Sequence, residues 1–478
     1  MSYLANLPSS KSLIHFSGIG GIGMSGIAEI LHNMGYALQG SDLSTNDSTA
    51  RLSDFGIKVF QGHSEENVKN IALLVKSTAI KDDNPEVVYC KKHNIPVISR
   101  TEMLAELMAL KTSISISGTH GKTTTTSLVA AIFEKANLSP TVINGGIINN
   151  KGTNAYIGKS DYLITEADES DATFIKIPST IAVITNIDPE HLDYYKTFAN
   201  LKKAFKTFID NLPFYGFGIL CIDHPEVRKL ASQIKDKKII TYGINSEDAD
   251  IYAYNIRQST AGSKFDIKIS SKLNKKFKIL KNIKLHIPGI HNVQNSLAAI
   301  AIAIELGFDK KVIIDGFSEF RGVKRRFTKI AIYKGVTIVD DYAHHPAEIM
   351  ATLETARQAT KEKHGKIIAI FQPHRYTRLS SLMKEFADSF NKADKIYIAD
   401  VYSAQEAPIA GANKESLIAA IKKKHKSLDV HPLNSKDDLV NIIKQDCKKN
   451  DLLLFLGAGD ITKWAHGLPE KLNERCFH

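Results

Sequence analysis

One stretch, residues 113–126 with the sequence SISISGTHGKTTTT, constrains the fold of this chain more than any other. A strand-like run ends in a loop that closes with Gly121, Lys122 and Thr123, and a helix-like segment follows. A strand, a glycine loop and a helix in this order are typical of a phosphate-binding loop. Gly118 and Gly121 let the backbone curl so that several N–H groups point at one phosphate. The stretch therefore predicts an α/β domain that binds a nucleotide.

The loop departs from the common pattern G-x-x-x-x-G-K-[ST]. Ile116 stands where the first glycine is expected, and Gly118 lies three residues before Gly121. A chance match and a true variant of the loop are both compatible with this spacing. In a true loop, Lys122 would reach the β- and γ-phosphates, and the Thr123 hydroxyl would ligate Mg²⁺.

Strand-like and helix-like runs alternate along all 478 residues, which predicts α/β domains with parallel sheets. At about 100–200 residues per domain, the length allows about three domains. We expect an N-terminal Rossmann-like domain at 1–108, a central P-loop ATPase with a mixed sheet at 109–322, and a C-terminal Rossmann-like domain at 323–478. Residues 250–287 alternate apolar and basic side chains, which suggests antiparallel strands added to the central parallel core.

The net charge is +11, but the lysines are scattered in ones to threes. Because no basic stripe is interleaved with aromatic residues, we expect no nucleic-acid partner, although the positive field would suit an acidic substrate. The apolar run at 14–31 contains several glycines and Glu29, so it makes a poor membrane helix and we expect no membrane partner. The four cysteines are far apart, as in a cytosolic protein with reduced thiols.

A second glycine loop follows the first strand-like run of the chain. Gly18, Gly20 and Gly23 satisfy G-x-G-x-x-G, with Gly21 in addition. Backbone N–H groups at the start of the following helix suit a diphosphate. Ser41 and Asp42 end the next strand, where a carboxylate would meet a ribose or a base. NAD, another diphosphonucleotide and a simple tight turn all remain compatible with this motif.

Two acidic segments follow strand-like runs of the central block. The run ending at Thr165 leads into the carboxylates Glu166, Asp168, Glu169 and Asp171. Such a density of negative charge needs solvent or a bound cation, and Mg²⁺ prefers hard oxygen ligands. The run IAVIT ends in NIDPEHLDYY, which makes His191 a candidate metal or phosphate contact. A solvated acidic loop and a structural histidine are the alternatives.

Polar clusters also follow the strand-like runs of the C-terminal block. Open α/β sheets bind ligands outside the carboxyl ends of their strands. The clusters lie at 340–346, 372–378, 400–403 and 457–460. Arg375 and Arg378 would form a fork for a carboxylate or phosphate, unless they are ordinary surface arginines.

Taken in order, these stretches resemble the Mur ligase family over nearly the whole chain. The matching segments are GIGGIGMSGIAEIL, SGTHGKTTTT, EADESD, TNIDPEHLDYY, PGIHNVQNSLAA, GVKRRF, DDYAHHPAEI, PHRYTR and GAGDITK. The Mur form of the phosphate loop starts with Gly-Thr and lacks the early glycine. The resemblance therefore identifies the loop as a family variant.

The resemblance implies a cytoplasmic enzyme of peptidoglycan precursor synthesis that uses ATP and Mg²⁺. The form of the first loop favours the members that join L-alanine to UDP-N-acetylmuramate through an acyl phosphate. The related ligase that attaches a recovered tripeptide is an alternative. A non-catalytic sugar-nucleotide binding protein and an NAD dehydrogenase are alternatives outside this class, and a monomer and a homodimer are both compatible.

The resemblance also implies roles for individual residues. ATP would be bound by Gly118, Thr119, His120, Gly121, Lys122, Thr123, Thr124, His291, Asn292, Asn295, Arg325, Asp340 and Asp341. The UDP-sugar would be bound by Gly18, Gly20, Gly21, Gly23, Ser41 and Asp42, and alanine by Tyr342, His344, Arg375 and Arg378. Thr123, Glu166 and His191 would support the metal. Catalysis would rest on Lys122, Glu166, His191, His344 and Arg375.

Overall fold

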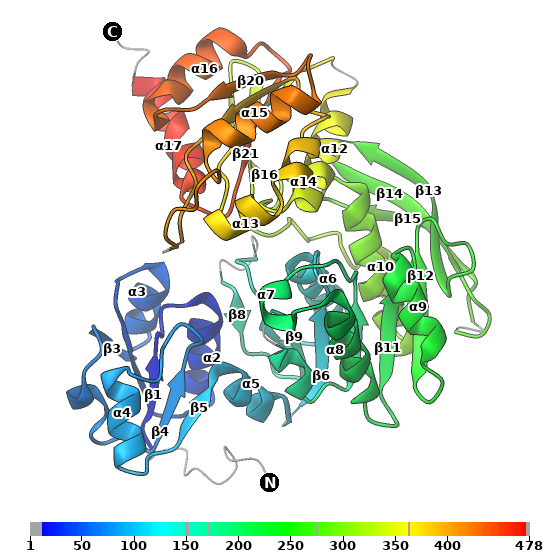
Figure 1. Cartoon of the computed structure of the whole chain (residues 1–478). Helices are drawn as coiled ribbons and strands as arrows, with labels where there is room; N and C mark the ends of the chain where they lie inside the picture. The colour runs from blue at the N-terminus through cyan, green and yellow to red at the C-terminus, as the bar shows by residue number, and fades with distance from the viewer. Residues whose placement is uncertain are drawn as a thin grey trace. The chain divides into compact units, whose positions relative to one another are not determined.

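The computed structural model shows three sheets with helices packed against them (Figure 1). It describes residues 12–109, 111–148, 153–170, 172–259, 261–273, 276–361, 364–404 and 406–474. In this part of the chain, no helix is long and apolar enough to cross a membrane.

The N-terminal sheet has five strands in the order β3-β2-β1-β4-β5, and all neighbours are parallel. Its strands are β1 (Ile14–Ser17), β2 (Leu38–Asp42), β3 (Lys58–Gln61), β4 (Leu73–Lys76) and β5 (Val97–Ser99). Its helices are α2 (Ile22–Asn33), α3 (Asp47–Asp54), η1 (Glu65–Val68), α4 (Pro85–Lys92) and α5 (Arg100–Ala109). The strands from β1 to β3 extend the sheet in one direction, and β4 and β5 extend it in the other, so the strand order reverses between β1 and β4. Such a switch point is where doubly wound sheets bind ligands.

The central sheet has ten strands in the order β15-β14-β13-β12-β11-β10-β6-β9-β7-β8. Its strands are β6 (Thr112–Ser117), β7 (Thr141–Ile143), β8 (Ala155–Tyr156), β9 (Tyr162–Glu166), β10 (Ile181–Ile184), β11 (Phe217–Cys221), β12 (Lys238–Gly243), β13 (Ile251–Ser259), β14 (Gly262–Ile269) and β15 (Ile279–Leu285). Its helices are α6 (Lys122–Lys135), η2 (Thr173–Lys176), α7 (Leu192–Tyr195), α8 (Phe198–Asp210), α9 (Pro225–Gln233), α10 (Ile290–Glu305) and α11 (Lys310–Asp315). The sheet is mixed, because β7 pairs with β8 antiparallel while β6 pairs parallel with both β9 and β10.

The C-terminal sheet has six strands in the order β16-β17-β21-β18-β19-β20. Its strands are β16 (Thr328–Tyr333), β17 (Val336–Asp341), β18 (Ile367–Phe371), β19 (Lys395–Ile398), β20 (Asp429–Pro432) and β21 (Leu452–Leu456). Its helices are α12 (Pro346–Lys361), α13 (Tyr376–Ser381), α14 (Met383–Asp388), α15 (Lys414–Lys424), η3 (Lys436–Asp438), α16 (Leu439–Asp446) and α17 (Ile461–Glu474). The edge strand β16 runs antiparallel to β17, and the other pairs are parallel. The three sheets agree with the predicted three-part α/β organisation.

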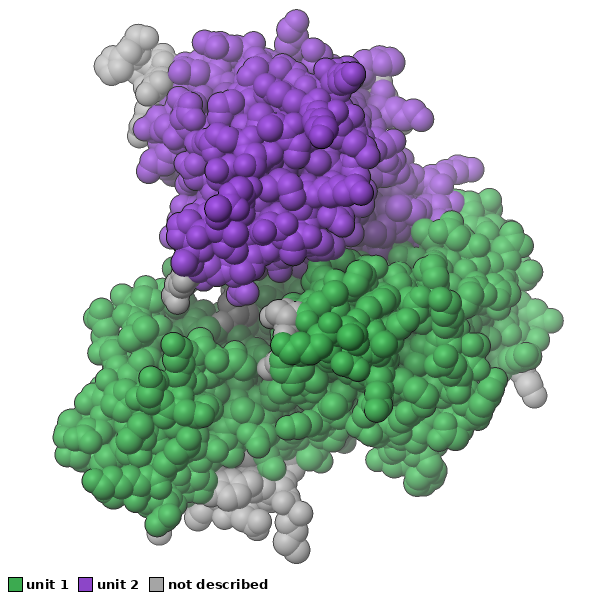
Figure 2. Space-filling model, viewed as in Figure 1, with its two compact units in different colours: residues 1–255, 265–284, 294–321 green, residues 256–264, 285–293, 322–478 purple. Residues whose placement is uncertain are grey.

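The chain divides into two compact units (Figure 2). The first comprises residues 1–255, 265–284 and 294–321, and therefore contains the N-terminal sheet and most of the central sheet. The second comprises residues 256–264, 285–293 and 322–478, and contains the C-terminal sheet.

Burial of apolar side chains explains why the interior strands of the sheets form. The runs IAVI in β10, IIAIF in β18 and LLLFL in β21 are buried at every position, as in parallel sheets covered on both faces. Helix α8 instead buries one stripe, formed by Leu201, Ala204, Phe205, Phe208 and Ile209. Burying each large apolar side chain stabilises the fold by about 2 kcal/mol. Parallel neighbours then bring the loops after β6, β9 and β10 to one edge of the sheet.

Candidate active site

The phosphate loop connects β6 to α6 through two glycines with positive φ. Gly118 has φ +130°, and a Cβ there would lie 2.1 Å from Thr185 Oγ1. Gly121 has φ +86°, and a Cβ there would lie 2.7 Å from Asn295 Oδ1. Glycine is therefore required at both positions for conformation and for space. The helix α6 begins directly after Gly121, so its free N–H groups face the loop.

Lys122 is held inside this loop by a buried carboxylate. Its Nζ donates to the carbonyl oxygen of Gly118 at 2.6 Å and to Glu169 Oε2 at 2.9 Å. The side chain of Glu169 is 1% exposed. Burial disfavours the charge of Lys122, but the carboxylates of Glu169 and Asp168 outweigh it and raise the pKa of Lys122. The lysine is therefore a fixed positive charge at the mouth of the loop.

The acidic segment after β9 supplies further carboxylates. Glu166 Oε1 accepts a hydrogen bond of 2.6 Å from the N–H of Gly145. Burial disfavours the charged form of Asp168. The charge of Lys122 and then the N–H of Ser170 nevertheless lower its pKa, with smaller contributions from Arg100 and His191. Asp168 is therefore ionised near neutral pH. Asp171, the fourth carboxylate of the predicted cluster, lies outside the described residues.

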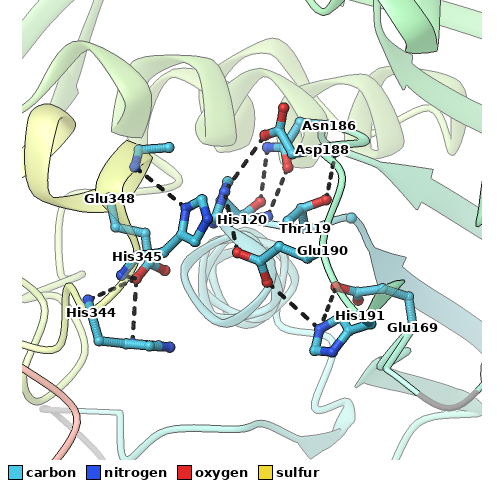
Figure 3. Close-up of polar contacts among 12 residues, drawn as sticks. Thr119, His120, Glu169, Asn186, Asp188, Glu190, His191, His344, His345 and Glu348 are labelled. Atoms are coloured by element: carbon cyan, nitrogen blue, oxygen red, sulfur yellow. Dashed lines mark hydrogen bonds and ion pairs between the residues drawn. The ribbon is translucent and has the colours of Figure 1, made fainter. Parts of the chain in front are cut away.

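The segment after β10 carries His191 and joins the phosphate loop to the acidic segment (Figure 3). His191 has φ 56°, and its Nε2 lies 3.8 Å from Glu169 Oε1 and 3.6 Å from Glu190 Oε2. The imidazole of His120 lies 3.5 Å from Asp188 Oδ2. A left-handed backbone at a non-glycine residue is strained, and such strain gathers at functional sites. Lys122, Glu169 and His191 thus form one cluster.

The predicted metal ligands Thr123, Glu166 and His191 offer donor atoms that fit a divalent cation. Thr123 lies in the first turn of α6, Glu166 ends β9, and His191 directly precedes α7. Carboxylate and hydroxyl oxygens are the ligands that Mg²⁺ prefers, and it takes few protein ligands beside substrate phosphates.

The N-terminal glycine loop is tied to the end of β2. Gly18 has φ +78°, and its N–H donates to the carbonyl oxygen of Ser41 at 2.8 Å. The N–H of Gly20 donates to Asp42 Oδ2 at 2.8 Å. A Cβ on Gly20 would lie 2.9 Å from the same carboxylate oxygen. Asp42 therefore fixes the loop itself. Gly21 precedes α2 with no side-chain cap, so the helix N-terminus has no polar side chain of its own over it.

Four aromatic rings line the carboxyl edge of the C-terminal sheet in the second unit. Tyr342 lies edge-on to His344 with ring centroids 5.0 Å apart, and His344 lies 5.8 Å from His374. His374 stacks on Tyr402 at 5.5 Å. Burial lowers the pKa of both histidines to about 4, so these rings are neutral at pH 7.

Arginines accompany these rings. Arg375 has φ 71°, a strained value for a non-glycine residue, and its N–H donates to the carbonyl oxygen of Tyr402 at 2.9 Å. Within the described residues, Arg378 has a buried Nη1 with no hydrogen-bond partner. A buried guanidinium donor without a partner fits an anionic ligand. This edge of the sheet thus carries two arginines beside four aromatic rings.

Family models match three consecutive parts of the chain. Residues 13–112 match "Mur ligase family, catalytic domain", residues 116–303 match "Mur ligase middle domain", and residues 325–459 match "Mur ligase, glutamate ligase domain". Together they cover most of the chain. The chain belongs to the Mur ligase family.

Among known proteins, this Mur ligase is similar to UDP-N-acetylmuramate–L-alanine ligases. It is 56% identical to the one from Rickettsia felis over 462 residues, with 97% of each chain covered. It is 56% identical to that of Rickettsia canadensis, with 98% of each chain covered. The crystal structure of UDP-N-acetylmuramate-alanine ligase from Thermotoga maritima superposes with a TM-score of 0.80 at 30% identity, covering 97% of this chain and 99% of that one. A murein peptide ligase from Psychrobacter arcticus shares the fold, with a TM-score of 0.70 at 22% identity over 96% and 98% of the two chains.

Several of the remaining candidates of this Mur ligase are buried or hydrogen-bonded. Asn292 Nδ2 donates to the carbonyl oxygen of Pro288 at 2.6 Å, just before α10. Burial lowers the pKa of His291 to about 4. Arg325 Nη2 donates to the carbonyl oxygen of Gly457 at 2.6 Å. Asp340 is fully buried and accepts from Thr462 Oγ1 at 2.7 Å.

Asp341 is held mainly by backbone groups. Its two carboxylate oxygens accept from the N–H groups of Phe327 and Ala343 at 2.7 and 2.8 Å. Burial raises its pKa to about 6 in spite of these bonds and of the nearby charge of Arg326. The carboxylate therefore links the start of β16 to the turn after β17.

One polar cluster of this Mur ligase was not predicted. Glu86 of α4 is fully buried and accepts from Ser17 Oγ at 2.6 Å, Ser41 Oγ at 2.7 Å and Asn67 Nδ2 at 2.9 Å. His15 Nε2 lies 3.3 Å from the same carboxylate. One side chain thus ties together the ends of β1 and β2. The sequence gives no signal for it, because Glu86 lies in a helix at no recognisable motif.

Proposed function

We propose that this Mur ligase joins L-alanine to the carboxylate of UDP-N-acetylmuramate at the expense of ATP. The observation that supports this most is the similarity over nearly full length to L-alanine ligases, in a chain whose phosphate loop holds Lys122 on a buried carboxylate. Mur ligases are ATP-dependent, which agrees with this loop. We place the reaction in cytoplasmic peptidoglycan precursor synthesis, catalysed by a monomer or a homodimer.

We assign the ligands to the three predicted domains, with ATP contacted by two of them. The UDP-sugar binds to residues 1–108, through the set Gly18, Gly20, Gly21, Gly23, Ser41 and Asp42. ATP binds to residues 109–322, through the loop at 118–124 together with His291, Asn292 and Asn295. Residues 323–478 contribute Arg325, Asp340 and Asp341 toward ATP, and Tyr342, His344, Arg375 and Arg378 toward alanine.

The chemistry requires an activated carboxylate, because a carboxylate is a poor electrophile. A carboxylate oxygen of the sugar substrate takes the γ-phosphoryl group, and the bond to ADP breaks. The alanine nitrogen then attacks the carbonyl carbon, and phosphate leaves with its electron pair. Lys122 neutralises charge that develops on the transferred group. When bound at Thr123, Glu166 and His191, Mg²⁺ would supply charge stabilisation to the same oxygens.

The alanine amine must lose a proton as the new bond forms. The ring of His344 is neutral at pH 7 because burial lowers its pKa to about 4. A neutral imidazole accepts a proton, whereas an imidazolium cannot. Arg375 and Arg378 would bind the alanine carboxylate and leave its amine free.

The experiment is phosphate release with ATP, Mg²⁺ and UDP-N-acetylmuramate, with and without L-alanine, for the wild type and Lys122→Ala. We expect release that depends on alanine and is lost in the variant. Release with the recovered tripeptide but not with alanine would identify the recycling ligase instead. Tight binding of the sugar nucleotide with no release under either condition would identify a binding protein.

A further inference from the structure

A cavity of about 220 Å³ lies in the first unit, between elements of the N-terminal and central sheets. One wall is formed by α2 and α5, and another by the segments that follow β7 and β9. The polar side chains on it include Arg100, Asn144, Glu166 and Asp168. A single cation thus shares the cavity with two of the carboxylates that flank the phosphate loop.

Arg100 is the first residue of α5, and its side chain is half-buried. It makes no hydrogen bond or ion pair with the residues that the structure describes, and its charge helps to lower the pKa of Asp168. A guanidinium carries five N–H donors, and in Arg100 none of them is taken by a residue that the structure describes.

Two glycines leave space for the charged groups of this cavity. A Cβ on Gly23, in the first turn of α2, would lie 2.5 Å from Arg100 Nη1. A Cβ on Gly145 would lie 2.7 Å from Glu166 Oε2. The guanidinium occupies the position that a side chain on α2 would fill, and the carboxylate does the same beside β7. The cavity is therefore bounded by backbone at both charged groups.

We propose that Arg100 binds the carboxylate of UDP-N-acetylmuramate that becomes phosphorylated, and holds it beside Glu166. This inference rests on the proposed function. The carboxylate must approach a region that Glu166 and Asp168 make negative, so it needs a cation on its own side. A guanidinium pairs with a carboxylate through two parallel hydrogen bonds, which fix orientation as well as position. Holding the reacting atom in line is a large part of phosphoryl-transfer catalysis.

A second anionic group of the same substrate, its diphosphate, would also attract Arg100. The cavity favours the carboxylate, because the phosphoryl acceptor must lie near Glu166 and Lys122. The uncapped N-terminus of α2, directly after the glycine loop, already offers backbone N–H groups to a diphosphate.

The test compares two sugar nucleotides. UDP-N-acetylmuramate carries the carboxylate, whereas UDP-N-acetylglucosamine has the same uridine diphosphate and lacks it. Binding of each is measured by calorimetry without ATP, for the full-length wild type, Arg100→Gln and Arg100→Lys. Lys176→Gln is the matched control, because Lys176 is an exposed cation in η2 that does not line the cavity.

We expect Arg100→Gln to weaken binding of UDP-N-acetylmuramate about tenfold or more, as for loss of a charge-assisted hydrogen bond. Binding of UDP-N-acetylglucosamine should change less than about twofold, since its contacts remain. Arg100→Lys keeps the positive charge but lacks the paired N–H donors of a guanidinium. Its loss of affinity for UDP-N-acetylmuramate should therefore lie between that of Arg100→Gln and none. Lys176→Gln should bind both ligands as the wild type does.

Three results would overturn the proposal. Equal losses for both ligands would place Arg100 on the diphosphate. Unchanged binding of both by Arg100→Gln and Arg100→Lys would remove Arg100 from the sugar-nucleotide site. A wild type that binds neither ligand would refute the proposed function itself, and Arg100 would then lose its ligand as well. Circular dichroism of each variant separates a binding defect from unfolding.

Discussion

At the scale of single residues, the most informative contact is the ion pair between Lys122 and Glu169. The lysine side chain is 16% exposed and the glutamate side chain 1% exposed, so both charges are largely removed from water. Breaking a buried pair costs more than the pair itself contributes, because one charge is left without a partner. Glu169 therefore keeps the loop lysine charged and oriented in the absence of a nucleotide.

Replacing Glu169 by Gln should lower the free energy of unfolding by about 3 kcal/mol, since Lys122 stays buried and loses the carboxylate that it contacts. Urea denaturation at pH 7 measures this loss. The double variant Glu169→Gln with Lys122→Met removes the stranded charge and should recover part of the stability. A double variant as unstable as the sum of the two single variants would show that the residues are not coupled.

Glu86 should make the stability of the N-terminal sheet depend on pH. Burial opposes its charge, but hydrogen bonds and charge from His15, Ser17 and Asn67 lower its pKa to about 2. A carboxylate with a lowered native pKa stabilises the fold above its unfolded value, here 4.5, and loses this contribution as pH falls toward 2. At about 1.4 kcal/mol per pKa unit, the contribution at pH 7 is about 3 kcal/mol.

Glu86→Gln should therefore be less stable than the wild type at pH 7, and the difference should shrink below about pH 4.5. Denaturant titrations at several pH values measure it. Asp82→Asn is the control, because Asp82 is exposed and pairs with Lys76 and Lys91 at the surface, where ion pairs contribute little. A constant difference across the acid range would contradict the assignment.

At the scale of elements, the turn between β6 and α6 places a strict steric demand on the phosphate loop. Gly118 needs both its positive φ and the absence of a Cβ. Gly118→Ala should reduce phosphate release about a hundredfold or more, because a misplacement of about 1 Å costs this much in positioning. Binding of the sugar nucleotide should persist, since the loop at 18–23 is separate.

Gly35→Ala provides the matched control for this prediction. Gly35 also has a positive φ, +89°, but a Cβ there would meet nothing within 4 Å. The substitution adds backbone strain of about 1 kcal/mol without a clash. It should lower the melting temperature and leave phosphate release intact. Loss of release in both variants would mean that general destabilisation, and not the loop, is responsible.

Burial also decides which elements can be predicted from sequence. The runs IAVIT, KIIAIF and DLLLFLG correspond to the buried strands β10, β18 and β21. The strand β3 was not expected, because KVFQ lies at a sheet edge with no buried position. The strand β20 ends in Pro432, which removes a backbone donor and obscures the pattern. Short apolar runs identify central strands, whereas edge strands depend on neighbours that the sequence does not show.

At the scale of the whole molecule, the loops after buried strands were predictable, but the contacts between them were not. Lys122, Glu166 and His191 follow strands, so their common edge follows from parallel topology. The pairing of Lys122 with Glu169, and the position of Arg100 in a cavity with Glu166, depend on side-chain packing between elements distant in sequence. Glu86 illustrates the same limit, because its partners come from three separate segments.

The proposed reaction draws residues from both units, and this leads to a prediction for the whole chain. Lys122 and His191 belong to the first unit, whereas His344 and Arg375 belong to the second. If all of them act on one substrate carboxylate and one amine, ligands that contact both units must favour a closed arrangement.

Addition of UDP-N-acetylmuramate with a non-hydrolysable ATP analogue and Mg²⁺ should therefore reduce the radius of gyration in small-angle X-ray scattering. Lys122→Ala should show a smaller reduction at the same ligand concentrations, because it binds the nucleotide more weakly. A radius that is unchanged at saturating ligand would show that the two sets of residues do not need to close around the substrates.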